Sequence, residues 1–133
     1  MNKAQPASRP TRIVVVEDSE DILFIMKVEL EEFGYMVEVA RDALTALELS
    51  ARFKPDVIIS DIGMPGIDGI EFIRRLRRTS LRDVPVIALS GYSADPDLKS
   101  FESHGFSAHL TKPVDPGQLD DVVQALLRAN KSK

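Results

Sequence analysis

The sequence predicts a doubly wound α/β fold, in which helices cover both faces of one parallel sheet. Short apolar runs alternate with amphipathic segments five times along the chain, which is the pattern of repeated strand–helix units. The runs that begin near residues 12, 56 and 84 are continuously apolar, and such runs indicate strands that are buried on both faces. Four runs end on charged or hydroxyl residues. Ligands of an open parallel sheet bind at the carboxyl ends of its strands, so the functional edge is predicted there.

In the first half of the chain, local signals mark where each element begins and ends. We expect strands at 12–17, 35–40 and 56–60, and helices at 20–33 and 42–53. Ser19 can cap the first helix, because its hydroxyl can accept a hydrogen bond from the first turn. Gly34 suits the position just after that helix. Pro55 ends the second helix, since the residue before a proline disfavours the helical conformation.

The second half of the chain continues the alternation after a loop rich in glycine and proline at 63–69. We expect helices at 70–78, 96–104 and 116–129, and strands at 84–89 and 108–110. The last helix carries leucine and valine at helical spacing, which predicts one buried face. Residues 1–11 are predicted to be a flexible leader or linker, residues 12–129 one folded domain, and residues 130–133 a frayed tail.

Length and composition exclude several classes of protein. A chain of 133 residues forms one domain. It contains no cysteine, which excludes disulfides, zinc–thiolate clusters and a catalytic thiol. The net charge of -4 gives no general basic surface for nucleic acid. No apolar run is long enough to span a membrane, and the start of the chain lacks a signal core. We therefore expect a cytoplasmic protein.

The residues at the four run ends form a candidate phosphate-handling site. They are Glu17 and Asp18, Asp61, Ser90 and Lys112. Taken alone, each acid could be a turn or capping residue, and Ser90 and Lys112 could be ordinary loop residues. Together, three carboxylates would repel one another unless a positive group offset them. Magnesium prefers oxygen ligands and often binds one or two carboxylates with water and phosphate.

Other chemistries fit the sequence poorly. The glycine patterns of dinucleotide sites and of phosphate-binding loops are absent, as is the nucleophile elbow of hydrolases. The two histidines, His104 and His109, lack a clear acid partner in the sequence. The arginines at 74, 75, 77, 78 and 82 are interpreted as a solvated helix end that matches the helix dipole.

Four segments resemble the receiver domain of bacterial response regulators. They read IVVVEDSE, DVIISDIGMPGIDGIEFIRRLR, VIALSG and HLTKPV, and the resemblance extends over residues 12–129. It implies a flavodoxin-like sheet of five parallel strands in the order 2-1-3-4-5, with five helices.

The resemblance also implies a role for each candidate site residue. Asp61 would be the phosphoacceptor and would bind Mg²⁺ together with Asp18 and the backbone carbonyl of Gly63. Glu17 would hold the ion through water. Lys112 and Ser90 would contact the phosphoryl group, and the Lys112-Pro113 bond would be cis.

This sequence departs from the commonest family pattern at the switch position of the fifth strand. A tyrosine or phenylalanine is usual there, whereas this chain has His109. We expect His109 still to swing inward on activation. Gly63 and Tyr92 occupy the two positions that tune dephosphorylation in the family.

The resemblance implies a phosphorylation-dependent switch of two-component signalling, which is not an enzyme beyond promoting its own phosphorylation and dephosphorylation. Its donor would be a histidine kinase or a histidine phosphotransfer protein, and its output a protein partner. It would act alone or as part of a hybrid kinase. The alternatives are a pseudo-receiver that only binds partners and a small metal-dependent phosphatase.

The helix at 20–33 is more apolar than one buried face requires. We expect it to be broadly buried. The alternative is that some of its apolar residues dock a kinase or phosphotransfer helix; they are Ile22, Leu23, Phe24, Ile25, Met26, Val28 and Leu30.

Overall fold

The computed structural model describes residues 9–63, 69–91 and 105–131, and these ranges contain five strands and four helices. In chain order the elements are β1 (Arg12–Val16), α1 (Glu20–Glu32), β2 (Met36–Ala40), α2 (Ala43–Phe53), β3 (Val57–Asp61), α3 (Gly69–Leu76), β4 (Val86–Ser90), β5 (Ala108–Thr111) and α5 (Pro116–Lys131). The helix that we expect at 96–104, which includes His104, lies outside the described residues.

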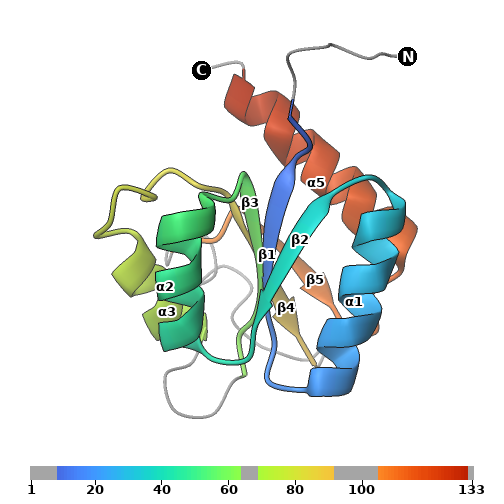
Figure 1. Cartoon of the computed structure of the whole chain (residues 1–133), viewed down its shortest axis with the longest axis horizontal. Coiled ribbons are helices and arrows are strands. Elements are labelled where there is room, and N and C mark those ends of the chain that lie inside the picture. Colours follow the sequence, from blue (N-terminus) through green and yellow to red (C-terminus); the bar gives the residue numbers. More distant parts are fainter. Residues whose placement is uncertain (1–8, 64–68, 92–104, 132–133) are drawn as a thin grey trace.

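The five strands form one sheet in the order β2-β1-β3-β4-β5, and every neighbouring pair is parallel. The predicted strand order is therefore confirmed. Helices α1 and α5 lie on one face of the sheet, and α2 and α3 lie on the other (Figure 1). All carboxyl ends of the strands consequently meet at one edge, which carries the candidate site.

Each central strand contributes to two cores, because successive side chains of a strand point to opposite faces. In β1, Ile13 and Val15 pack in the core under α1 and α5, whereas Val14 and Val16 pack in the core under α2 and α3. This two-sided burial explains why β1, β3 and β4 are continuously apolar in sequence.

Helix α1 is less buried than we expect from its composition. Its N-cap, Ser19, accepts the hydrogen bond from the Ile22 backbone N–H as predicted, at 3.4 Å. Only Leu23, Met26 and Leu30 are buried in the core. Broad burial of this helix is therefore wrong, since Phe24 is 68% exposed and Ile25 is 53% exposed. Ile22 and Ile25 line one hollow beside α1 and Phe24 lines another, so these apolar side chains lie outside the core.

Arg77 is a structural residue rather than part of a solvated basic end. It follows α3, and its guanidinium donates hydrogen bonds to the backbone oxygens of Arg82, Val84 and Gly105 at 2.7–2.8 Å. Burial lowers the pKa of Arg77 from its ordinary value. The side chain thus ties the end of α3 to the segments that lead into β4 and β5. The solvated interpretation is wrong at this residue.

The edge of the sheet opposite the site holds both ends of the described chain. Arg9 forms an ion pair with Asp56 at 3.0 Å, and the Arg12 backbone N–H donates to the same carboxylate. Asp56 and Asn130 line one shallow hollow at this edge. No helix in the described ranges has both the length and the apolar character needed to cross a membrane.

Candidate functional site

Three carboxylates converge where β1 and β3 end. Glu17 and Asp18 directly follow β1, and Asp61 is the last residue of β3. The two strands are neighbours, and the register pairs Val16 with Ser60, so Glu17 lies beside Asp61. One carboxylate oxygen from each of the three acids lies within 4.8 Å of the other two. The predicted acidic cluster is therefore present.

Lys112 reaches this cluster from the end of β5. Its Nζ lies 2.8 Å from Oε1 of Glu17 and 3.4 Å from Oδ2 of Asp61. Its backbone N–H donates to the Ser90 carbonyl at 2.8 Å, which fixes the segment after β5 against β4. Glu17 is thus the nearer of the two acidic partners of Lys112. The Lys112-Pro113 peptide bond is cis, as the resemblance implies.

The pKa values of the ion pair follow from the burial of its members. Burial raises the pKa of Glu17, against the hydrogen bonds from Lys112 and the Ser19 N–H that lower it, and the charge of Asp61 adds to the rise. Burial lowers the pKa of Lys112, but its hydrogen bond with Glu17 and the charge of Asp61 outweigh this, so that the pKa of Lys112 is raised. The free-energy cost of removing a charge from water is larger for Glu17, because its side chain is 2% exposed, whereas that of Lys112 is 25% exposed.

The donor set fits a divalent cation that prefers oxygen. Three carboxylates around one ammonium leave an excess of two negative charges when all are ionised. Both oxygens of Glu17 already accept hydrogen bonds, from Lys112 and from the Ser19 N–H at 3.0 Å, which suits contact with an ion through water. Asp18 is partly exposed at the mouth of the cluster and can bind directly.

Asp61 is held in a defined orientation. Its Oδ1 accepts a hydrogen bond from the Gly63 backbone N–H at 3.0 Å, and its Oδ2 faces Lys112. A side chain at Gly63 would approach Oδ1 at 3.8 Å, which is ordinary contact. The Asp61 carboxylate is almost buried.

Ser90 and His109 form a contact that the sequence does not predict. The resemblance makes Ser90 a contact of the phosphoryl group and places His109 at the switch position, and the structure joins the two directly, with Ser90 Oγ 2.8 Å from Nε2 of His109. The register pairs Asp61 with Leu89, so Ser90 lies one residue beyond Asp61 on the neighbouring strand. His109 is already turned toward Ser90 in this structure.

A sequence model of one family covers most of the chain. The model described as "Response regulator receiver domain" matches residues 13–124. Among curated proteins, an uncharacterized 14.6 kDa protein of Leptolyngbya boryana is 40% identical over 84% of this chain and 86% of that protein. The KDP operon transcriptional regulatory protein KdpE of Escherichia coli is 38% identical over 92% of this chain. The chain spans 53% of KdpE, and about half the length of the other transcriptional regulators it matches.

Solved structures show the same fold. The chemotaxis protein CheY4 of Vibrio cholerae superposes with a TM-score of 0.83 at 30% identity, over 88% of this chain and 98% of that one. The signal receiver domain of a histidine kinase from Syntrophus aciditrophicus gives 0.82 at 35% identity, over 92% and 94%. The receiver domain of sensor histidine kinase PA1611 from Pseudomonas aeruginosa gives 0.81 at 27% identity, over 90% and 98%, and holds a magnesium ion in its active site cleft.

Proposed function

The chain belongs to the response regulator receiver family of two-component signalling, and on this basis we propose that it is a phosphorylation-dependent switch whose phosphoacceptor is Asp61. One observation carries the proposal. Asp61 lies at the end of a buried strand with Glu17 and Asp18 on one side and Lys112 within 3.4 Å. A carboxylate in that setting has both the nucleophilic oxygen and the positive neighbour that phosphoryl transfer needs.

The reaction is an in-line transfer from a phosphohistidine. A carboxylate oxygen of Asp61 attacks phosphorus, the new P–O bond forms, and the P–N bond breaks with its electron pair returning to the imidazole of the donor. Charge spreads over the three equatorial oxygens as this happens. Lys112 supplies an ammonium for one of these oxygens, and the Ser90 hydroxyl can donate a hydrogen bond to another. The chain promotes its own phosphorylation in this way. It also promotes its later dephosphorylation, in which water attacks phosphorus, the P–O bond to Asp61 breaks and inorganic phosphate leaves.

We propose that the cation is Mg²⁺. Asp18, Asp61 and the backbone carbonyl of Gly63 would hold it, and Glu17 would contact it through water. Bound there, it would neutralise the charge of the carboxylates and of the phosphoryl oxygens. The magnesium ion in the PA1611 receiver domain supports this assignment.

Phosphorylation would act as a local charge event with a wider consequence. The acyl phosphate carries about two negative charges, where the ionised Asp61 carboxylate carries one, beside an already acidic cluster. Lys112 and Ser90 are the donors at hand; Ser90 is the last residue of β4, and Lys112 directly follows β5. Phosphorylation would change which groups Lys112 and Ser90 contact. Such a local change of contacts can shift a protein from one of two conformations to the other.

Phosphorylation of the unmodified chain tests the function. We expect intact mass spectrometry to show one added phosphoryl group after incubation with acetyl phosphate and Mg²⁺, and none after chelation of the metal. Beryllofluoride should shift amide resonances around Asp61. Neither an adduct nor a shift would favour a pseudo-receiver, and steady turnover of small phosphoesters would favour a phosphatase.

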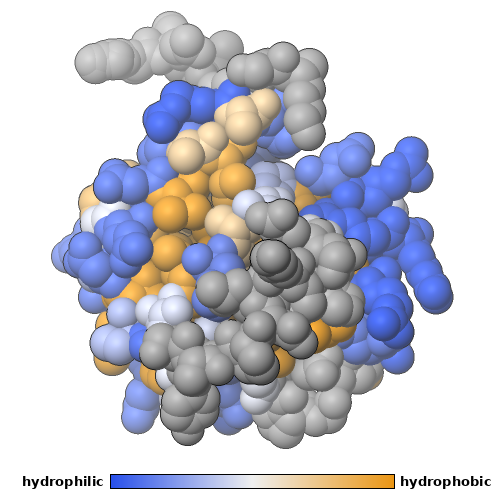
Figure 2. Space-filling view, turned by 180° about the vertical axis from the view of Figure 1, so that it is seen from behind, coloured by the Kyte–Doolittle hydropathy of each residue, from blue (hydrophilic) through white to orange (hydrophobic). Residues whose placement is uncertain are grey.

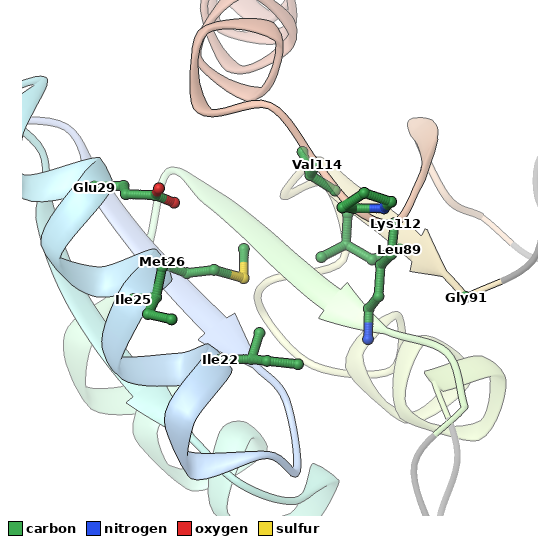
Figure 3. A pocket seen from close by; sticks show the side chains of 9 residues that line it. Ile22, Ile25, Met26, Glu29, Leu89, Gly91, Lys112 and Val114 are labelled. Atoms are coloured by element: carbon green, nitrogen blue, oxygen red, sulfur yellow. The ribbon is translucent and has the colours of Figure 1, made fainter.

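We further propose that the donor protein docks on α1. A hollow of about 500 Å³ lies between α1 and the segment after β5 (Figure 3), and its apolar lining includes Ile22, Ile25, Met26, Leu89, Pro113 and Val114. Lys112 lines the same hollow and also contacts Asp61, so the surface is continuous with the site. In the view from behind, in which α5 faces the viewer, a band of hydrophobic residues extends along α5 toward the side of the molecule on which α1 lies (Figure 2).

Charge identifies the kind of partner that fits this surface. The only base of α1, Lys27, is paired with Glu31 at 3.0 Å. The acids of the helix are Glu20, Asp21, Glu29, Glu31 and Glu32. A second copy of the same surface would therefore bring like charges together. We propose that the occupant is the phosphohistidine-bearing helix of the donor, with an apolar stripe and a basic rim.

Ile25→Asp is expected to slow transfer from a phosphorylated histidine phosphotransfer protein about tenfold or more, which is the usual effect of losing a central interface residue. The donor used would be the phosphotransfer protein that, among a panel of such proteins, phosphorylates the wild-type chain fastest. The rate with acetyl phosphate should be unchanged, because Ile25 is exposed and does not touch Asp61. Leu44→Asp is the matched control, since Leu44 is 55% exposed on α2 and does not line the hollow. Equal rates for wild type and Ile25→Asp with the protein donor would remove the docking proposal.

A further inference from the structure

We propose that His109 positions the Ser90 hydroxyl through a direct hydrogen bond, and that phosphorylation of Asp61 reverses the direction of this bond. The inference rests on the proposed function and deepens it. It starts from the 2.8 Å contact between Ser90 Oγ and His109 Nε2. Ser90 is only 3% exposed, so water cannot readily replace this partner.

The number of protons in this contact limits what Ser90 can do. A serine hydroxyl has one hydrogen to donate, whereas its oxygen can accept two hydrogen bonds. Nε2 of a neutral imidazole either accepts or, if it carries the proton, donates. If Ser90 donates its hydrogen to Nε2, it has none left for a phosphoryl oxygen. If Nε2–H donates to Oγ, the hydroxyl hydrogen remains available.

In the unphosphorylated protein, Ser90 is expected to donate to His109. A buried hydroxyl hydrogen needs an acceptor, because an unmade buried hydrogen bond is costly. Among the described residues, Nε2 of His109 lies at hydrogen-bond distance. The ring would then be the tautomer with its proton on Nδ1.

In the phosphorylated protein, Ser90 would contact both His109 and a phosphoryl oxygen. The hydrogen bond between Ser90 and His109 must then reverse its direction. A phosphoryl oxygen only accepts, so Ser90 has to give its single hydrogen to that oxygen. Nε2 must then carry a proton and donate it to Oγ. The change is one of tautomer, in which the proton leaves Nδ1 for solvent and solvent returns one to Nε2. The result is a chain from Nε2–H to Oγ–H to the phosphoryl oxygen, in which each bond polarises the next.

A phenylalanine ring at this position would fill similar space but has no nitrogen, and so it cannot take part in such a chain. The position therefore acts here through a hydrogen bond and not only through the size of its side chain. His109 comes from β5 and Ser90 from β4, and the two strands pair directly. A change at Ser90 is thus passed to the next strand through one bond.

The tautomer of His109 is the direct test. In protein labelled with ¹⁵N in its imidazole rings, we expect His109 Nε2 to change from an unprotonated to a protonated nitrogen when beryllofluoride and Mg²⁺ are added. Nδ1 should change in the opposite sense. The spectrum of His109→Gln identifies which signals belong to His109 and which to His104. A Nε2 that stays of one type in both states would overturn the inference.

Rates give a second, independent test. Ser90→Ala and His109→Phe are each expected to slow phosphorylation by acetyl phosphate about tenfold, the effect of one lost hydrogen bond of ordinary strength. The double variant should be no slower than either single one, because both changes remove the same chain. His109→Gln should recover part of the rate, since its amide can donate to Oγ. Additive losses, or a His109→Phe rate equal to wild type, would contradict the positioning role.

The two tests separate this inference from the proposed function. A chain that takes a phosphoryl group while His109 Nε2 does not change keeps its function and loses only the role of His109. A chain that neither takes the group nor responds to beryllofluoride loses both.

Discussion

Asp61→Asn is expected to abolish phosphorylation by acetyl phosphate and by any protein donor. The amide keeps the shape of the carboxylate, and its oxygen can still accept the Gly63 N–H bond seen at 3.0 Å, so the fold should persist. It has no anionic oxygen to attack phosphorus. It also removes one of the three carboxylates that surround the proposed cation position. The intact mass should stay that of the unmodified chain at every time point.

Asp83→Asn is the matched control for this experiment. Asp83 is exposed and lines the hollow that also contains Asp56, at the edge opposite the site. This variant carries the same chemical change and should be phosphorylated like the wild type. An adduct on Asp61→Asn would show that another group, with Asp18 or Glu17 nearest, is the acceptor.

Gly69→Ala is expected to destabilise the fold by about 1–3 kcal/mol, the usual effect of forcing extra atoms into a packed interior. A Cβ at Gly69 would lie 2.6 Å from Ile62 Cα and 2.8 Å from the Asp61 carbonyl oxygen. Both neighbours are backbone atoms, so they cannot move aside as a flexible side chain would. The midpoint of urea unfolding should fall. Phosphorylation should slow as well, because the displaced backbone belongs to Asp61 and Ile62.

Gly63→Ala is the control for Gly69→Ala, because it also replaces a glycine but adds its Cβ without close contacts to described backbone atoms. At Gly63 an added Cβ would lie 3.8 Å from Asp61 Oδ1, its nearest neighbour among the residues that the structure describes, and the residue has no left-handed backbone requirement. Its unfolding midpoint should stay close to that of the wild type. If Gly69→Ala and Gly63→Ala unfolded at the same urea concentration, close packing of α3 against the end of β3 would not be what requires Gly69.

The sequence predicts most of the sheet and of the site, because both depend on features that are local in the chain. Burial on two faces leaves continuous apolar runs, and parallel strands bring the residues that follow those runs to one edge. Glu17, Asp61 and Lys112 could therefore be placed together before their contacts were known. The strand order came from the family resemblance and not from periodicity.

What the sequence does not predict depends on pairings across the fold. The preference of Lys112 for Glu17 and the bond between Ser90 and His109 arise because β5 packs beside β4 in one register. Arg77 has the composition of a surface residue, yet its three carbonyl partners come from segments that only the fold brings together. The exposure of Phe24 could be suspected, since α1 has more apolar residues than one face can bury.

The position of Arg9 and Asn130 beside Asp56 makes this domain convenient to connect to other polypeptides. The described chain enters and leaves at the edge opposite Asp61, so a fusion partner or an affinity tag joined beside Arg9 or Asn130 should leave the proposed phosphotransfer unobstructed. A short linker joining the two ends would also allow circular permutation, with new ends opened in a surface loop.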